Sequence, residues 1–314
     1  VALPSGAVID HRLNKLDRNY ALTATNIGVS YMFAGRIDLG RLQLSLKRLL
    51  AECPVLAGRA DFKTLTVSSE NAFVPLEIIE NFPGSAGDYA EAGKNIRNRS
   101  DFVHESSLRE TRNGRSPVMA VRLTRFTKGG CALGVTINHA VMDSRGFHLI
   151  MTRWSEISQS LNGGKPGAPI IISEDVFEFE TGRSTALLLE DIERAGKPRP
   201  QNYGNLTGRI LKSLIFKVLD IIKKRDREMV HLSPSQVESL RDHVRREAGL
   251  ERLSRNIAVS AHVIHALIPS QTDERETKIK LANVIDVRSR LRGPYLAKQA
   301  CYAGNAIYLL MGEL

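Results

Sequence analysis

The feature that most constrains the fold is a run of eight residues, Cys131–Asn138 (CALGVTIN), in which nearly every side chain is apolar or small. A strand with one solvent face would alternate apolar and polar residues, so this run predicts a strand buried on both faces at the centre of a sheet. After it, apolar residues recur at the spacing of one helix face until residues 162–164 (NGG) end the pattern. The sequence therefore predicts a buried strand, a loop beginning at His139, and an amphipathic helix.

The rest of the first half predicts three more strands, at residues 26–37, 72–79 and 118–126. A helix follows the first of these strands. Asp38 is a suitable N-cap, apolar residues recur at helical spacing from residue 39 to residue 53, and Pro54 ends the pattern.

The second half begins with a short strand predicted at residues 229–232, followed by helix signals and further strands. Ser233 and Gln236 form a capping box around Pro234, and Ser254 is the N-cap of a further helix. Strands are predicted at residues 279–287, where apolar residues alternate, and at 305–311. Because strands and helices alternate in both halves, we predict an α/β or α+β fold. The predicted organisation is an N-terminal domain (1–165), a proline-bracketed crossover segment (166–226) and a C-terminal domain (227–314).

Composition excludes several classes of protein. No run of about 18 uncharged apolar residues is present, so no transmembrane segment is predicted. The N-terminus has no basic region followed by an apolar core, so no signal peptide is predicted. Cys53, Cys131 and Cys301 lie far apart among apolar residues, which indicates buried thiols in a reducing compartment rather than disulfides or zinc ligands. A cytoplasmic protein is therefore expected.

The formal net charge is +10, and it is spread along the chain with one dense cluster at residues 223–227. A basic surface attracts nucleic acid, anionic lipid or a phosphorylated small molecule. No zinc-finger, homeodomain or RNP-type pattern accompanies the cluster, so we predict no nucleic-acid partner. A basic amphipathic helix predicted at residues 210–224 fits either a membrane surface or the protein core, and the core is the commoner place for such a helix.

The loop after the buried strand carries His139 and, four residues later, Asp143. Histidine can take a proton from a hydroxyl or amine as a nucleophile forms. Two roles are open for Asp143: it holds the loop or orients the histidine ring, or it points away and pairs with a distant arginine. Arg288 and Arg290 end a predicted buried strand, where a cation needs a carboxylate partner. Asp143 is a candidate for that partner.

These residues belong to a set of short motifs that resembles one family. HAVMD (139–143) is preceded by a Leu-rich helix that runs into CPVLAGRA (53–60), and is followed by DVRSR (286–290) and GNA (304–306). Each piece is modest by itself, but their order and spacing resemble the BAHD acyltransferases, within the HxxxD superfamily of CoA-dependent acyltransferases. The resemblance extends from the first predicted strand to the last.

The resemblance implies two similar domains of chloramphenicol-acetyltransferase-like fold, with mixed sheets flanked by helices and an active-site channel at their interface. It implies a transfer of an acyl group from acyl-CoA, as co-substrate, to a hydroxyl or amine of a small-molecule acceptor. His139 would be the general base, while Asp143 would turn away and pair with Arg288. Ser254 falls near a position that often helps to bind CoA. No permanent cofactor and no metal are implied, and a monomer is expected.

The sequence departs from the family pattern in two places. The family usually has glycine directly after the aspartate, where this chain has Ser144, with Gly146 two residues later. The DFGWG motif of the family is absent before the last residue, Leu314. An alternative prediction is therefore a truncated, catalytically inactive homologue that binds a ligand or a partner. Condensation domains share HxxxD but usually carry a second histidine where this chain has Asn138, which argues against that class.

Other candidate sites are weaker. His262 and His265 lie three residues apart on a predicted helix, but no third ligand is near in sequence, and zinc normally takes at least three protein ligands. None of the cysteines has the local histidine or asparagine signature of a catalytic thiol. The glycines of NGGKPG (162–167) lack the strand–loop–helix setting of a phosphate-binding loop.

Overall fold

The computed structural model describes residues 1–3, 9, 11–12, 26–61, 66–68, 72–92, 100–104, 110, 116–163, 230, 232–267, 280–286, 288 and 302–313. The chain divides into two compact units: Val1–Arg225 with Ala282–Met311, and Asp226–Leu281 with Gly312–Leu314. The predicted crossover segment (166–226) and the basic helix predicted at 210–224 lie outside the described residues. The domain boundaries at residues 1–165 and 227–314 stay a prediction.

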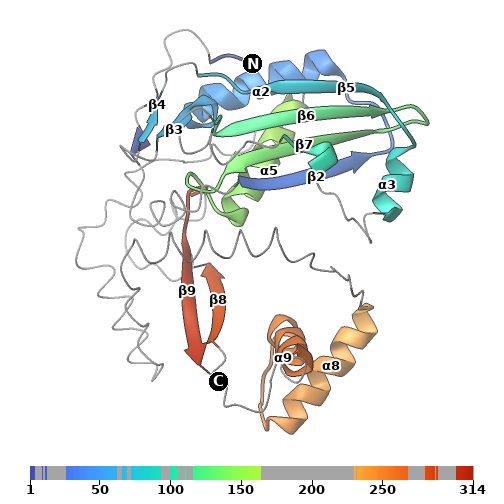
Figure 1. Cartoon of the computed structure of the whole chain (residues 1–314), viewed down its shortest axis with the longest axis vertical. Coiled ribbons are helices and arrows are strands. Elements are labelled where there is room, and N and C mark those ends of the chain that lie inside the picture. The colour runs from blue at the N-terminus through green and yellow to red at the C-terminus, as the bar shows by residue number, and fades with distance from the viewer. Residues whose placement is uncertain are drawn as a thin grey trace. The chain divides into compact units, whose positions relative to one another are not determined.

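A four-stranded mixed sheet forms the centre of the first unit (Figure 1). Its strands are β2 (Asn26–Phe33), β5 (Leu76–Phe82), β6 (Met119–Phe126) and β7 (Cys131–Asn138), in the order β2-β7-β6-β5. β7 runs antiparallel to both of its neighbours, whereas β5 and β6 are parallel. The strand predicted from CALGVTIN is confirmed as a central strand, and the other three predicted strands are present with shifted ends.

The two faces of β7 are both buried but carry side chains of different size. Leu133, Val135 and Ile137 belong to the main hydrophobic core on one face, because alternate side chains of a strand point the same way. The opposite face carries small residues, among them Gly134. A Cβ atom on Gly134 would lie 1.6 Å from the carbonyl oxygen of Phe102, so this glycine lets another segment of the chain lie directly against the sheet.

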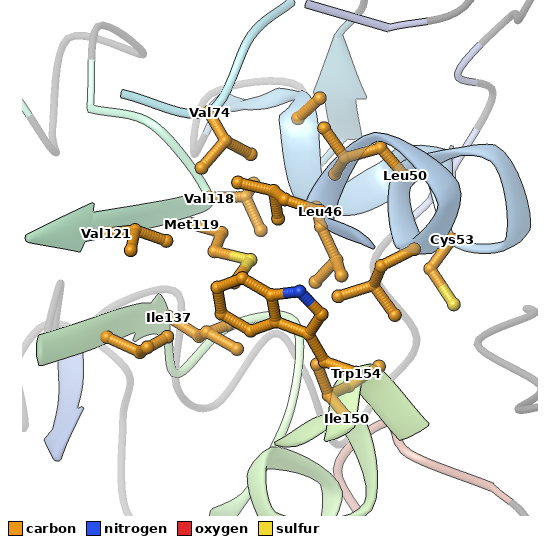
Figure 2. Packing of buried hydrophobic residues seen from close by; sticks show 14 of the residues in the cluster. Leu46, Leu50, Cys53, Val74, Val118, Met119, Val121, Ile137, Ile150 and Trp154 are labelled. Atoms are coloured by element: carbon orange, nitrogen blue, oxygen red, sulfur yellow. The ribbon is translucent and has the colours of Figure 1, made fainter. Parts of the chain in front are cut away.

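Two helices cover the face with the larger side chains: α2 (Leu39–Glu52) and α5 (Ser144–Ser160). Both lie behind the sheet in the view of Figure 1. Figure 2 shows the indole ring of Trp154, from α5, among Leu46 of α2 and Met119 of the sheet. The amphipathic stripes predicted for both helices are confirmed, since their apolar residues form one core with the sheet.

Polar side chains also tie α5 to α2. The Nε1 of Trp154 donates to the Oγ of Ser45 at 2.9 Å. Arg153 donates from Nε and Nη2 to the two carboxylate oxygens of Glu52, each at 2.8 Å, and from Nη1 to Glu156 at 3.1 Å. Only 5% of Arg153 is exposed, so its charge is neutralised at the edge of the core by a bidentate pair.

The ends of α2 follow from the local sequence, as predicted. The carboxylate of Asp38 accepts a hydrogen bond from the backbone N–H of Arg41 at 2.6 Å, which caps the first turn. Pro54 opens a short 3-10 helix, η1 (Pro54–Ala57), because a proline has no N–H to continue the helical ladder.

The opposite face of the sheet is covered by α3 (Ala86–Ala92) and a short 3-10 helix, η3 (Ser100–Phe102). A second, smaller core lies there. It consists mainly of aromatic rings whose centroids are 5.1–5.7 Å apart, the rings of Phe82, Tyr89, Phe102 and Phe126. The central strand therefore separates two apolar layers, which explains its burial on both faces.

Two smaller sheets complete the described strands of the chain. β1 (His11–Arg12), β4 (Thr66–Ser68) and β3 (Arg59–Asp61) pair in that order. β8 (Lys280–Asp286) pairs with β9 (Ile307–Glu313). The strands predicted at 279–287 and 305–311 are thus confirmed within a few residues. Of the short strand predicted at 229–232 the structure describes residues 230 and 232, and neither lies in a strand.

The second unit contains two helices that pack on each other, α8 (Pro234–Glu247) and α9 (Arg255–Leu267). The predicted capping box is confirmed: the backbone N–H of Gln236 donates to Ser233 Oγ at 3.3 Å, and the backbone N–H of Ser233 donates to Gln236 Oε1 at 2.8 Å. In the described parts of the chain, no helix has the length and apolar character needed to cross a membrane.

Replacing Arg153 by alanine is expected to destabilise the first unit by about 2–3 kcal/mol, because hydrogen bonds to charged groups contribute about 1.5–3 kcal/mol and the aliphatic stem loses its packing. Urea unfolding measures the change. Arg145→Ala is the control, since the Arg145 side chain is 60% exposed in its ion pair with Asp286. It should cost less than about 1 kcal/mol. Equal effects of the two substitutions would contradict the role given to Arg153.

Candidate active site

His139 directly follows β7, where the buried strand gives way to the loop that leads into α5. The backbone N–H of Asn138 donates to the carbonyl oxygen of Val118, the residue before β6, at 2.7 Å, which extends the pairing of β7 with β6 to the end of β7. The N–H of Val141 donates to the carbonyl oxygen of Asn138 at 3.0 Å, so residues 138–141 form a tight turn. His139 is the partly exposed residue of this otherwise buried turn.

Asp143 is the N-cap of α5 and is 1% exposed. Its Oδ1 accepts hydrogen bonds from the backbone N–H of Gly146 and from Nη2 of Arg288, both at 2.9 Å. Its Oδ2 accepts from the backbone N–H of Ala306 at 2.8 Å. Each carboxylate oxygen is therefore bonded to a part of the chain other than His139.

Arg288 brings the other side of this network, and it is 5% exposed. Besides Asp143, it donates from Nε to the carbonyl oxygen of Tyr302 at 2.9 Å, from Nη1 to Asp286 at 3.1 Å, and from Nη2 to the carbonyl oxygen of Gly304. Its guanidinium also lies 5.8 Å from the centroid of the Tyr302 ring. Each of its three nitrogens therefore donates at least one hydrogen bond, and the two carboxylates neutralise the buried cation.

The structure therefore brings together two of the predicted site residues, Asp143 and Arg288, and settles which partner the carboxylate takes. Between the two open roles of Asp143, the geometry favours the distant arginine over the histidine ring. The same network fixes the start of α5, the end of β8 and the segment 302–306 to each other. Arg290, the second arginine of the DVRSR motif, lies outside the described residues.

The glycine expected after Asp143 is needed two residues later. Ser144 is exposed at the first position of α5, so a side chain is tolerated there. A Cβ atom on Gly146 would instead lie 1.7 Å from the carbonyl oxygen of Ala303. The close approach of segment 302–306 to the helix start therefore requires glycine at position 146.

Ser254 lies in the second unit, where it caps α9 as predicted. Its Oγ accepts a hydrogen bond from the backbone N–H of Ile257 at 3.2 Å, and the residue is exposed. His262 and His265 are exposed on the same helix. Among the residues that the structure describes, no three His, Cys, Asp or Glu side chains gather as metal ligands do.

Two of the three cysteines, Cys53 and Cys131, are described, and both are buried. Burial, together with the nearby Glu52 carboxylate, raises the pKa of Cys53 to about 12, against the opposing effect of Arg153. Burial also raises the pKa of Cys131. Because the thiolate is the reactive form, neither environment suits a nucleophile.

Asn305 and Asn138 are two polar residues that sequence reasoning missed as part of the site. Asn305 is fully buried, and its Nδ2 donates to the carbonyl oxygen of His139 at 2.9 Å. The Oδ1 of Asn138 accepts from the backbone N–H of Ala140 at 2.9 Å. The signals in the sequence were the GNA motif, and an asparagine at the end of a strand, where its side chain can bond the backbone two residues on.

Replacing Gly146 by alanine is expected to destabilise the first unit by about 3 kcal/mol or more, because the new methyl group meets a backbone oxygen that cannot rotate away. The matched control is Ser144→Ala, two residues earlier on the exposed side of the helix. It should change stability by less than about 0.5 kcal/mol. Thermal unfolding of both variants measures this, and a Gly146→Ala protein as stable as the wild type would refute the close approach.

Cys53 is expected to react with an alkylating reagent much more slowly in the native protein than in the unfolded chain. The pKa of the Cys53 thiol is higher in the folded state than in the unfolded state, so folding favours the neutral thiol. Its contribution to the stability of the fold is therefore full below about pH 8.5 and is lost as pH rises toward about 12. At pH 8.5 about half of an unfolded thiol is ionised, but only about one in three thousand at a pKa of about 12. Mass spectrometry after iodoacetamide treatment should show Cys53 modified rapidly in guanidinium chloride and barely at all in the native protein. Equal rates would contradict its environment.

Comparison with known proteins shows the family. A family model described as "Transferase family" matches residues 92–313, which is well over half of the chain. A hydroxycinnamoyl-CoA:piscidic acid hydroxycinnamoyltransferase of Actaea racemosa is 30% identical over 200 residues, which cover 60% of this chain and 39% of that protein. Anthranilate N-benzoyltransferase protein 1 of Dianthus caryophyllus is 26% identical over 194 residues, which cover 62% of this chain and 39% of that protein. The chain thus spans about two-fifths of the length of these relatives.

Solved structures show the same fold. F. sporotrichioides TRI101, complexed with coenzyme A and T-2, matches with a TM-score of 0.62 at 15% identity, over 98% of this chain and 68% of that chain. The fold class predicted from the sequence, mixed sheet flanked by helices, is confirmed. From the family model and these relatives, we conclude that the chain belongs to the BAHD acyltransferases, a family of transferases.

Proposed function

We propose that the protein transfers an acyl group from acyl-CoA to a hydroxyl or amine of a small-molecule acceptor, with His139 as the general base. The observation that carries this proposal is the division of roles at the HAVMD loop. Asp143 is buried and engaged on both oxygens, whereas His139 is partly exposed on the same rigid loop. A base must reach its substrate, and a residue that holds the loop need not.

In the proposed reaction a single base both removes and returns the proton. His139 takes the proton of the acceptor hydroxyl or amine, and the acceptor oxygen or nitrogen attacks the carbonyl carbon of the thioester. The carbon–sulfur bond of the tetrahedral intermediate then breaks, and CoA leaves with the proton that His139 returns. No residue other than His139 changes protonation state over the cycle. Asp143 and Arg288 act as structural support, because their charges satisfy each other.

The known proteins that resemble this chain support both substrates. The TRI101 structure is a complex with coenzyme A, and the name of the Actaea racemosa relative includes an acyl-CoA. The Dianthus caryophyllus relative is named as an N-benzoyltransferase, so oxygen and nitrogen acceptors both belong in the test. Within this proposal Ser254 contributes to CoA binding. Its Oγ accepts one hydrogen bond at the start of α9, and its hydroxyl proton can be donated to a phosphate near that helix end.

The experiment is acyl transfer by the purified chain, followed as product formation with a panel of acyl-CoA donors and small alcohols and amines. His139→Ala should lower turnover by about 10²- to 10⁴-fold, the usual contribution of a positioned general base. The control is His148→Ala, since His148 is an exposed histidine on α5. That variant should keep its activity.

Three outcomes separate the candidates. Unchanged turnover in His139→Ala would overturn the role of the histidine. Thermal stabilisation by CoA without turnover of any acyl-CoA in the wild type would instead favour a ligand-binding homologue, since binding to the native state raises its apparent stability. If CoA does not stabilise the protein and no acyl-CoA is turned over, acyl-CoA is not a substrate and that part of the proposal is wrong.

A further inference from the structure

The backbone around His139 is held by two asparagine side chains that act on one peptide unit. The carbonyl of His139 and the N–H of Ala140 are the two polar groups of the same planar peptide bond. Asn305 donates to the first from Nδ2 at 2.9 Å. Asn138 accepts from the second with Oδ1 at 2.9 Å. The two asparagines come from segments 167 residues apart in the numbering, yet they bond opposite ends of one plane.

The chemistry of the partners fixes which amide atom faces which group. A backbone carbonyl only accepts, so Asn305 must present its NH₂ to His139. A backbone N–H only donates, so Asn138 must present its oxygen to Ala140. The pair is therefore directional, and each asparagine contributes a different half of its amide.

Holding this plane fixes the direction in which the His139 side chain leaves the backbone. Upstream, the N–H of Asn138 is bonded to the carbonyl oxygen of Val118 at 2.7 Å, so the chain enters His139 from a fixed strand. Downstream, the orientation of the 139–140 peptide plane sets the ψ angle of His139. With both sides fixed, the direction of the bond from Cα to Cβ is fixed as well.

Both asparagines are deeply buried, and hydrogen bonds in such a low-dielectric environment are stronger than hydrogen bonds exposed to water. Asn305 is 0% exposed and Asn138 is 1% exposed. The segment that carries Asn305 is itself attached to the same loop, because Ala306 N–H donates to Asp143 at 2.8 Å. The two asparagine hydrogen bonds and the Asp143–Arg288 ion pair therefore hold the same stretch of chain, residues 138–146.

We infer that Asn138 and Asn305 are positioning residues, which clamp the His139–Ala140 peptide plane and so aim the imidazole at the reacting groups. The inference rests on the proposed function, in which His139 is the general base. Asn138 stands where condensation domains carry a second histidine, and in this chain its amide oxygen holds the turn. Asn305, the asparagine of the GNA motif, holds the other end of the same peptide.

The first experiment is kinetic and uses the full chain. Asn305→Ala and Asn138→Ala each remove one end of the clamp, and we expect kcat to fall about 10- to 100-fold with KM changed less than about twofold, since a small displacement of a catalytic group costs rate rather than binding. Asn138→Ser should retain most of kcat, because a serine hydroxyl can also accept from the N–H two residues on. Asn305→Asp should behave like Asn305→Ala, because it places an acceptor against the carbonyl of His139.

The control for burial is Thr124→Val on β6. Thr124 is 0% exposed, and its hydroxyl finds no hydrogen-bond partner in the described part of the chain. Removing this buried polar group leaves the His139 turn intact, so kcat should stay at the wild-type value. A kcat loss in Thr124→Val equal to that of the asparagine variants, or full kcat in both alanine variants, would overturn the clamp.

The second experiment does not need turnover. Hydrogen–deuterium exchange followed by mass spectrometry should show faster exchange in residues 139–143 of both alanine variants, and wild-type exchange there in Asn138→Ser and Thr124→Val. Unchanged protection in the alanine variants would overturn the clamp even if the protein proved inactive. Loss of activity in His139→Ala with unchanged kinetics in the asparagine variants would overturn the clamp and keep the proposed function. Unchanged activity in His139→Ala would overturn the proposed function, while exchange still decides the clamp.

Discussion

The buried ion pair between Asp143 and Arg288 is the interaction on which the rest of this site depends. The two side chains are 1% and 5% exposed and come from residues 145 apart. Removing one partner of such a pair costs about 3–5 kcal/mol, because the other charge stays buried without compensation. Any arrangement in which only one of the two charges is buried is therefore much less stable than the native one. For this reason the ion pair fixes the position of the loop against Arg288, whereas an apolar contact can be repacked with other neighbours.

Around this pair, backbone groups supply most of the remaining hydrogen bonds. Asp143 accepts from two backbone N–H groups, and Arg288 donates to two backbone carbonyls. These partners cannot change rotamer, so backbone hydrogen bonds hold the loop, the start of α5 and the segment 302–306 together. The glycine at position 146 belongs to the same arrangement, since only a residue without a Cβ fits beneath the carbonyl of Ala303. The family pattern of glycine after the aspartate is thus met two residues later in this chain.

The sheet explains why the loop lies where it does. β7 is buried by helices on one face and by an aromatic cluster on the other, so it ends at a fixed place between two packed layers. Gly134 keeps the second layer close to the strand, because its missing side chain leaves room for the backbone of Phe102. The backbone of a residue that directly follows such a strand is held in place by the strand, and a catalytic side chain needs a well-defined position of this kind.

Much of this architecture was readable from the sequence. The continuous apolar run of β7, the stripes of α2 and α5, the cap at Asp38 and the capping box at Ser233 all depend on neighbours within a few residues, and local periodicity records them directly. The candidates His139, Asp143 and Arg288 were found from motifs. The tertiary structure alone decided that Asp143 turns to Arg288 rather than to the histidine ring, that Gly146 rather than Ser144 lies at the close approach, and that Asn138 and Asn305 hold one peptide plane. The contacts of Asp143, Gly146 and Asn305 join residues more than 100 positions apart, so only the packing of the whole unit determines them. The bond from Ala140 to Asn138 is local, and only the arrival of Asn305 at the same peptide plane needed the tertiary structure.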